Sequence, residues 1–193
     1  MTKAELRRTA AKRRQGMPGE VRAKASALIA QRLFSLKEWK MAETVFLYCG
    51  CKDEVNTDEI TDMALKEGKK VSLPRVISDS EMVFIEISSA EELVTGAYGI
   101  REPEDRGIYT QGIPDLILIP CVGVDMKGHR IGHGKGYYDR YLKDMRDVPK
   151  ICPAFSTQIV EEFAAEDTDI DMDIIVTEEG IYSTGNRQER YGR

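Results

Sequence analysis

A strand, a glycine-rich loop and a helix follow one another in the stretch that decides the fold of this chain. The strand is predicted over 115–120 from an apolar run closed by a proline, Asp115-Leu116-Ile117-Leu118-Ile119-Pro120. The loop and the start of a helix predicted over 137–146 follow in the run Arg130-Ile131-Gly132-His133-Gly134-Lys135-Gly136-Tyr137-Tyr138-Asp139-Arg140. This order places the loop near the carboxyl end of a strand and at the amino end of a helix, where open α/β sheets bind ligands.

The composition of the glycine loop (132–136) suggests a site for an anion. Glycine lets the backbone approach a ligand closely, and exposed N–H groups ahead of a helix attract phosphate oxygens. The spacing excludes a Walker A loop, because Gly136 is followed by Tyr137, which also stands where a dinucleotide fingerprint needs its third glycine. The run is therefore a different nucleotide loop, or a set of tight turns without a ligand.

Apolar runs alternate with helical patterns along the rest of the chain. A capping-box spacing of Asn56 and Glu59 marks the start of one helix, and Pro74 is expected to stop one strand. Strands that alternate with helices predict βαβ units and a largely parallel sheet covered on both faces. Helices are predicted over 3–15, 19–36 and 57–66, and further strands over 44–48, 70–73, 82–87, 150–155 and 173–177.

Two other segments are predicted to be irregular. The segment 95–114 is rich in Gly, Pro and charge, and such a long stretch in a compact domain is more often a binding loop or lid than a spacer. The tail after Tyr182 (183–193) is expected to fray. The length of 193 residues favours one domain over 1–193.

Composition narrows the class of protein. A net charge of −5 argues against non-specific nucleic-acid binding, and no apolar run approaches the length of a membrane span, so we expect a cytoplasmic protein. The four cysteines lie in or beside apolar runs and are expected to be reduced, buried thiols. Cys49 and Cys51 could form half a metal site, but there is no second pair at ligand spacing.

Several residues could serve phosphoryl transfer, which needs positive charge around the phosphoryl group and carboxylates for Mg²⁺. Lys135 and Arg140 could neutralise phosphate oxygens, or they could be solvated surface cations. Asp139 could bind Mg²⁺, or it could only stabilise the helix dipole. Asp173 is a second candidate, although composition alone does not favour it over Asp169 or Asp171.

Two further features remain ambiguous from the residues alone. Lys3 and Arg7 share one face of the first helix, which on its pattern is more simply a solvated basic helix. His133 is either a loop residue or a general acid or base, a role for which the sequence shows no partner.

The residues carry a resemblance to a known family. The run Pro120-x-x-Gly123-Val124-Asp125-x-x-Gly128-x-Arg130-Ile131-Gly132-x-Gly134-Lys135-Gly136-Tyr137-Tyr138-Asp139-Arg140 resembles the signature of 5-formyltetrahydrofolate cyclo-ligases, also called methenyltetrahydrofolate synthetases. Similar segments occur in the same order at Lys3-x-x-Leu6-Arg7, Glu54-Val55-Asn56-Thr57, Gly99-Ile100-x-Glu102-Pro103 and Met172-Asp173-Ile174-Ile175. The resemblance spans nearly the whole chain.

This resemblance implies a single three-layer α/β/α domain with a mainly parallel sheet, and an activity. The family converts 5-formyltetrahydrofolate to 5,10-methenyltetrahydrofolate with ATP and Mg²⁺, releasing ADP and phosphate. The formyl oxygen is phosphorylated, N10 attacks the activated carbon, and phosphate leaves. The partners would be these small molecules, with no nucleic acid or membrane, and the protein would be a monomer or a weak homo-oligomer.

The resemblance also assigns roles to positions of this chain. The catalytic candidates are Lys135, Arg140 and Tyr138, and Mg²⁺ would be held by Asp139 and Asp173. ATP would be contacted by Lys3, Ala4, Glu5, Leu6 and Arg7, and its triphosphate by Arg130, Ile131, Gly132, His133, Gly134, Lys135, Gly136, Tyr137 and Tyr138. The folate pocket would be lined by Cys51, Glu54 and Asn56, and bordered by Gly134, Lys135, Gly136, Tyr137 and Tyr138.

Rival functions stay open on the residues alone. One is another ATP-using small-molecule kinase or ligase built on the same loop, and another is a regulatory module that binds folate or nucleotide without turnover. Nucleic-acid binding through the basic first helix is the least favoured, and a steep salt dependence would reveal it.

Overall fold

A seven-stranded sheet organises the computed structural model, which describes residues 1–96, 99–145, 147–166 and 168–185. The strand order is β11-β10-β9-β6-β1-β2-β3. Pairs from β10 to β2 are parallel, and the two edge strands, β3 and β11, are antiparallel to their neighbours. The mainly parallel α/β fold predicted from the sequence is confirmed. The bounds of the sheet strands are β1 Thr44–Phe46, β2 Lys70–Val76, β3 Met82–Ile87, β6 Leu116–Leu118, β9 Lys150–Pro153, β10 Ile174–Val176 and β11 Ile181–Ser183.

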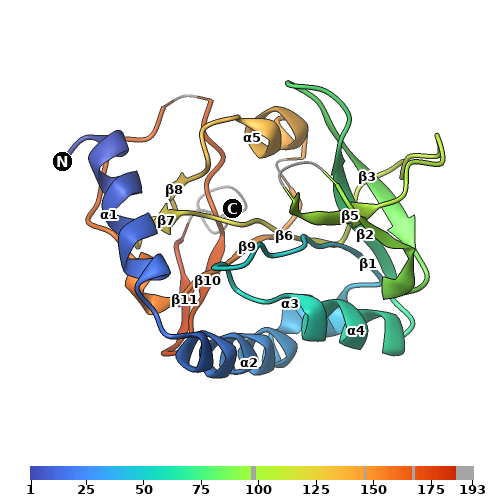
Figure 1. The fold of residues 1–193 in the computed structure, drawn as a ribbon, viewed down its shortest axis with the longest axis horizontal. Coiled ribbons are helices and arrows are strands. Elements are labelled where there is room, and N and C mark those ends of the chain that lie inside the picture. The colour runs from blue at the N-terminus through green and yellow to red at the C-terminus, as the bar shows by residue number, and fades with distance from the viewer. Residues whose placement is uncertain (97–98, 146, 167, 186–193) are drawn as a thin grey trace.

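Alternate residues of the central strands face two separate apolar cores. Val45 and Leu47 belong to the cluster shared with helices α2 (Gly19–Ser35), α3 (Lys37–Met41) and α4 (Asp58–Lys66). Phe46 points the other way, into a cluster that includes Leu142 of helix α5 (Tyr137–Leu142). Because side chains alternate along a strand, each central strand is buried on both faces. Figure 1 shows the resulting layers, with α2, α3 and α4 below the sheet and α5 above it.

Helix α1 (Lys3–Gln15) packs at one end of this arrangement, on the left in Figure 1. Thr2 and Glu5 form a capping box at its start. Leu6 and Ala10 form a third cluster with four buried residues from later in the chain, Val122, Ile131, Val160 and Phe163. Helix α1 packs closely against Gly123, since a Cβ added to this glycine would lie 3.2 Å from the Cβ of Ala10.

Smaller elements fill the connections, and the sequence analysis did not identify most of them. The helix α3 and the strand β11 were missed, as were two hairpins outside the main sheet. These pair β4 (Leu93–Thr95) with β5 (Arg101–Pro103), and β7 (Gly123–Val124) with β8 (Arg130–Ile131). The described residues also include the short 3-10 helices η1 (Ala90–Glu92) and η3 (Ser156–Gln158).

Pro74 does not stop its strand, contrary to the prediction. Strand β2 continues to Val76, with Pro74 opposite Phe84 of β3. Ser72 O accepts a hydrogen bond from Leu47 N, so the polar backbone atoms of Ser72 point towards β1. The backbone of Pro74, two residues later, points in the same direction, but β1 has already ended there. No ladder hydrogen bond is needed there, so a residue without an N–H is tolerated.

Three predicted boundaries also differ. Asn56 does not form a capping box, because its N donates to Ser26 Oγ and its Oδ1 accepts from Asp58 N, and α4 begins at Asp58. Helix α5 ends at Leu142, and Arg146 lies outside the described residues. The tail is ordered further than expected, since Ser183 pairs with Ile174 and Thr184 Oγ1 donates to Met172 O, while 186–193 lie outside the described residues. In the described part of the chain, no helix is both long and apolar enough to cross a membrane.

Candidate active site

A cavity of about 1420 Å³ opens beside the carboxyl ends of β1 and β6. Tyr48 and Cys49, which follow β1, and Pro120, which follows β6, line its base. The glycine loop forms part of its wall, together with both ends of helix α5. The position agrees with the expectation that an α/β sheet binds ligands where its parallel strands end.

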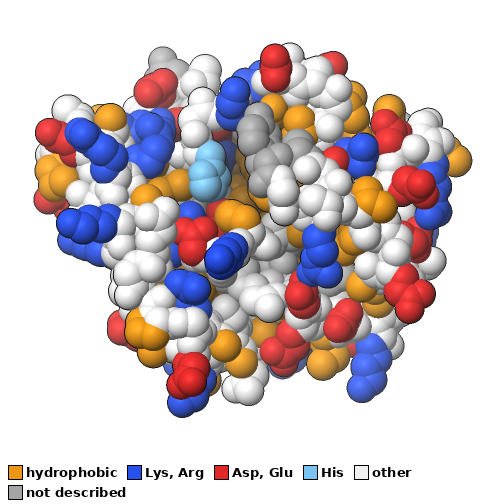
Figure 2. Space-filling view, in the orientation of Figure 1, with side chains coloured by type: hydrophobic (Ala, Val, Ile, Leu, Met, Phe, Trp, Pro, Cys, Tyr) orange, Lys and Arg blue, Asp and Glu red, His pale blue; other side chains and the backbone are white. Residues whose placement is uncertain are grey.

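One wall of the cavity is rich in cations. Lys3 and Arg7 reach it from α1, Arg130 from β8, Lys135 from the glycine loop, and Arg140 and Lys143 from the end of α5. Figure 2 shows Lys and Arg side chains gathered on the left of one face, over α1. This concentration of positive charge favours an anionic ligand.

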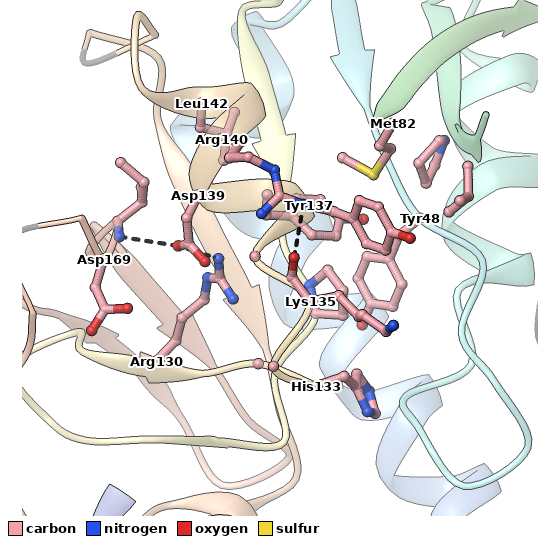
Figure 3. A pocket seen from close by; sticks show the side chains of 18 of the residues that line it. Tyr48, Met82, Arg130, His133, Lys135, Tyr137, Asp139, Arg140, Leu142 and Asp169 are labelled. Carbon is pink, nitrogen blue, oxygen red and sulfur yellow. Dashed lines mark hydrogen bonds and ion pairs between the residues drawn. The ribbon is translucent and has the colours of Figure 1, made fainter. Parts of the chain in front are cut away.

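The best-defined ion pair of this wall joins Arg130 to Asp139. Arg130 Nη2 lies 2.6 Å from Asp139 Oδ1, which also accepts from Ile170 N at 3.2 Å (Figure 3). Arg130 is 6% exposed, and its Nε is buried with no hydrogen-bond partner in the described part of the chain. A buried guanidinium with one unpaired N–H is ready to donate to a ligand, since such a donor is costly to leave unsatisfied.

Arg140 connects the glycine loop to the β2–β3 turn. Its Nη2 donates to Lys135 O at 2.7 Å (Figure 3). Its Nε donates to Ser80 O at 2.9 Å. Tyr137 supports the same connection, because its hydroxyl donates to Ser78 O and its ring lies 5.5 Å from the Arg140 guanidinium. Arg140 therefore holds the loop in place as well as adding charge.

Contacts of α1 hold the other side of this wall. Arg7 Nε donates to Gly132 O at 2.9 Å, which attaches the helix to the start of the glycine loop. Lys3 Nζ lies 2.6 Å from Asp169 Oδ2. Burial alone would raise the pKa of Asp169, but hydrogen bonds from Lys3 and from Glu166 N lower it below its usual value. Asp169 is therefore ionised at neutral pH.

Glu54 is a buried carboxylate of the opposite wall, at 9% exposed. Its Oε1 accepts from His133 Nε2 at 2.9 Å and from Arg14 Nη1 at 3.4 Å, and its Oε2 accepts from Cys51 N at 3.1 Å. Burial would raise the pKa of Glu54, but the hydrogen bonds from His133 and Cys51 outweigh it and lower the pKa. The carboxylate is therefore ionised at neutral pH.

The remainder of this wall is apolar and aromatic. Burial raises the pKa of Tyr48 and Tyr138, with a further contribution from the charge of Glu54. Burial also raises the pKa of Cys49 to about 11 and that of Cys51 to about 12. These four side chains hold their protons at neutral pH, and with Met82 and Pro74 they suit a flat, weakly polar ring system.

The cavity gathers most of the residues predicted from the sequence. It is lined by Lys3, Arg7, Cys51, Glu54, Arg130, Gly132, His133, Gly134, Lys135, Gly136, Tyr137, Tyr138, Asp139 and Arg140. All four described cysteines are free thiols, as expected, although Cys49 and Cys51 are only partly buried.

Six predicted residues do not line the cavity. Leu6 and Ile131 are buried in the third cluster, and Ala4 and Glu5 are exposed on α1. Asn56 is exposed and tied to the start of α4. Asp173 is 3% exposed, and its Oδ2 accepts a hydrogen bond from Lys150 N at the start of β9. Asp169 and Asp171, by contrast, line the cavity.

Other lining residues were not found from the sequence. Tyr48 and Met82 were predicted as strand residues, Pro74 as a strand stop and Cys49 as a buried thiol. Such patterns indicate burial and not which residues line a cavity. Arg14, which supports Glu54, was one of several cations in α1, and only its spacing of seven from Arg7 could have indicated a shared face.

Comparison with known proteins identifies the family of this chain. A model of the 5-formyltetrahydrofolate cyclo-ligase family matches residues 1–178. The 5-formyltetrahydrofolate cyclo-ligase of Mus musculus is 28% identical over 191 residues, covering 92% of this chain and 94% of the mouse protein.

Two solved structures are also similar. The 5,10-methenyltetrahydrofolate synthetase of Aquifex aeolicus has a TM-score of 0.79 and 35% identity, and the match covers 95% of this chain and 93% of that one. The corresponding synthetase of Mycoplasma pneumoniae has a TM-score of 0.72 and 29% identity, with 92% and 99% covered. The chain therefore belongs to the 5-formyltetrahydrofolate cyclo-ligase family of enzymes.

Proposed function

We propose that this protein converts 5-formyltetrahydrofolate and ATP to 5,10-methenyltetrahydrofolate, ADP and phosphate in a reaction that needs Mg²⁺. The observation that carries the proposal is the meeting of a cationic wall and an aromatic wall at the glycine loop of one cavity. Its volume of about 1420 Å³ exceeds the 300–1,000 Å³ typical of a site for one small molecule. A nucleotide and a folate can therefore be bound side by side.

The cationic wall suits the triphosphate of ATP. Arg130 offers its buried, unpaired Nε–H, and Lys135 has no ion-pair partner in the described part of the chain. The positive φ of Gly134 and Gly136, +93° and +66°, turns the loop backbone in a way that other residues rarely adopt. These groups would bind and orient the phosphates before reaction, which lowers the cost of charge development.

The carboxylates of the cavity fit Mg²⁺. The ion typically takes one or two protein carboxylates and completes its shell with water and phosphate oxygens. In the described ranges, no group of three or more His, Cys, Asp or Glu side chains is arranged to hold a metal. Asp139, with Asp169 or Asp171 from the neighbouring segment, would supply the protein oxygens, and Asp173 would not. Bound to the triphosphate, Mg²⁺ would neutralise charge on the phosphate oxygens.

The residues of the chain would promote two steps by position and charge. The amide oxygen of the formyl group attacks the γ-phosphorus, and ADP leaves. N10 then attacks the activated formyl carbon, its proton is lost, and phosphate departs as the ring closes. Lys135 and Arg130 would stabilise charge on the transferred phosphoryl group, and Tyr48, Met82 and Tyr138 would hold the pterin against the loop.

One assay tests this proposal. The purified protein is mixed with 5-formyltetrahydrofolate, ATP and Mg²⁺, and the methenyl product is followed by its absorbance. We expect product with one ADP per turnover, and none when ATP or Mg²⁺ is omitted. Binding of both ligands without product would instead support a regulatory module, and nucleotide turnover independent of the folate would support another ATP-using enzyme.

A further inference from the structure

One contact joins the two walls of the cavity. His133 belongs to the glycine loop, and its Nε2 lies 2.9 Å from Oε1 of Glu54, which belongs to the segment after β1. In Figure 3, His133 lies below Lys135, apart from the pair of Arg130 and Asp139. The imidazole thus stands at the border between the wall suited to phosphate and the wall suited to the pterin.

The contact with Glu54 determines which ring nitrogen of His133 can accept a proton. Glu54 is an ionised carboxylate, held by Cys51 N and Arg14, and an ionised carboxylate only accepts hydrogen bonds. Nε2 of His133 therefore carries the proton in this contact, and in the neutral ring Nδ1 has the lone pair. A base oriented by a carboxylate in this way is a recurring arrangement in catalysis.

The buried protic groups of the cavity are not bases at neutral pH. Burial raises the pKa of the thiols Cys49 and Cys51 to about 11 and about 12, and it raises the pKa of the phenols Tyr48 and Tyr138. All four groups keep their protons.

Two carboxylates of the cationic wall already have cationic partners. Asp139 pairs with Arg130, and Asp169 pairs with Lys3. Imidazole is the side chain best suited to exchange protons near neutrality, and the chain has two histidines, of which only His133 lines the cavity.

We propose that His133 is the catalytic base that removes the proton from N10 of the folate during ring closure. The inference rests on the proposed function, because N10–H is a group of that substrate. The N10–carbon bond forms, and the N10 proton passes to Nδ1 of His133. The electron pair left on N10 then expels phosphate from the carbon. The imidazolium donates from Nε2 to Glu54 and returns its proton to water after product release.

The charged and titratable groups around His133 come from three elements. Glu54, Asp53 and Cys51 belong to the segment after β1. Arg7 and Arg14 reach the site from α1, bonded to Gly132 O and to Glu54, and Lys135 follows in the same loop. The side chain of His133 is 57% exposed, so water can accept the proton between turnovers.

The first test is the pH dependence of kcat. In the wild-type protein we expect kcat to fall as pH decreases through the ionisation of the base. His133→Gln keeps a polar side chain but cannot take the proton. We expect it to lower kcat at pH 7.5 about 100-fold and to abolish this acid limb. The matched control is His129→Gln, which changes the other histidine, a residue bonded to Asp125 outside the cavity. We expect the control to keep the limb.

The second test separates proton removal from loop positioning. ADP and methenyl product are measured in rapid-quench experiments over the first turnover. If His133 acts in ring closure, His133→Gln forms ADP at the wild-type rate, with one equivalent per enzyme, and then forms methenyl product slowly. If the residue only positions the loop, the phosphorylation step that forms ADP slows in the same proportion.

The outcomes are distinct. A flat pH profile for His133→Gln with an intact burst of ADP supports the base. An unchanged acid limb, or a loss of the burst, overturns it while leaving the proposed function in place. If the wild-type protein forms no methenyl product, both proposals fall.

Discussion

Arg130 and Asp139 flank the glycine loop in the sequence and form an ion pair with each other, with 2.6 Å between Nη2 and Oδ1. The arginine lies in β8, before the loop, and the aspartate in the first turn of α5, after it. A partly buried pair of this kind loses much when one partner is removed, because the other charge is left in a poorly solvated site.

We therefore predict that Asp139→Asn lowers turnover about 100-fold while the protein stays folded. The amide lacks the charge that orients Arg130 and would bind Mg²⁺. Turnover is measured by methenyl absorbance and folding by far-UV circular dichroism. Asp144→Asn, an exposed carboxylate beyond the same helix, should behave like wild type. A fully active Asp139→Asn would remove the role assigned to Asp139.

The charge of Lys135 is available for a ligand, since no ion pair occupies it in the described residues. We predict that Lys135→Ala raises KM for ATP and lowers turnover about 100-fold, with the melting temperature almost unchanged. Lys135→Arg should retain part of the activity because it keeps the charge.

Lys37→Ala, at an exposed position of α3, is the matched control and should leave KM for ATP unaltered. If Lys135→Ala and Lys37→Ala gave the same KM for ATP, Lys135 would not contact the nucleotide.

Gly136 has φ +66°, and a Cβ there would lie 2.8 Å from Nη1 of Arg140. We predict that Gly136→Ala destabilises the protein by about 1–2 kcal/mol, because an L side chain is strained in this conformation. The added methyl also displaces the arginine that ties the loop to Ser80 O. Melting temperature and KM for ATP report the two effects separately.

Gly19→Ala provides the control, since a Cβ at the start of α2 meets nothing within 4 Å. We expect it to be neutral or slightly stabilising. Equal melting temperatures for Gly19→Ala and Gly136→Ala would contradict the strain argument.

Glu54 makes a pH-dependent contribution to stability. Its pKa is lower in the folded protein than its ordinary value of 4.5, because the hydrogen bonds from His133 and Cys51 outweigh burial. Because the pKa of Glu54 is lower in the folded than in the unfolded protein, ionised Glu54 stabilises the fold at pH values above its unfolded pKa. This stability is lost as the pH falls through the folded pKa. We predict that Glu54→Gln costs about 2 kcal/mol at pH 7 and that the cost shrinks towards pH 3.

Thermal melts of Glu54→Gln and wild type across this pH range measure the difference. Glu59→Gln, an exposed carboxylate on α4, should show no such trend. A cost for Glu54→Gln that stayed constant with pH would mean that the native contacts do not favour its ionised form.

Several elements of the fold could be predicted because their signals are local. The apolar run 116–118 is buried in the sheet as predicted, and α1 spans Lys3–Gln15, the range predicted for the first helix. The glycine loop could be predicted as an anion site because three alternating glycines, a lysine and a carboxylate lie within a few residues. The glycines indicate the backbone shape, and the other two residues indicate the charge. The sequence by itself therefore determined the α/β class and the location of the cationic wall.

Only the tertiary structure decided which distant residues complete the cavity. His133 and Glu54 are 79 positions apart, and their contact depends on the order in which β1 and β6 lie side by side. The packing of the loop before β10 brings Asp169 to the cavity, whereas Asp173 is buried and bonded to Lys150 N at the start of β9, although both lie in one acidic segment. Pro74 continues its strand because β1 is short, a fact about its neighbour. Periodicity and turn signals describe a residue and its nearest neighbours along the chain, whereas these contacts are set by strand order and packing across the whole sheet.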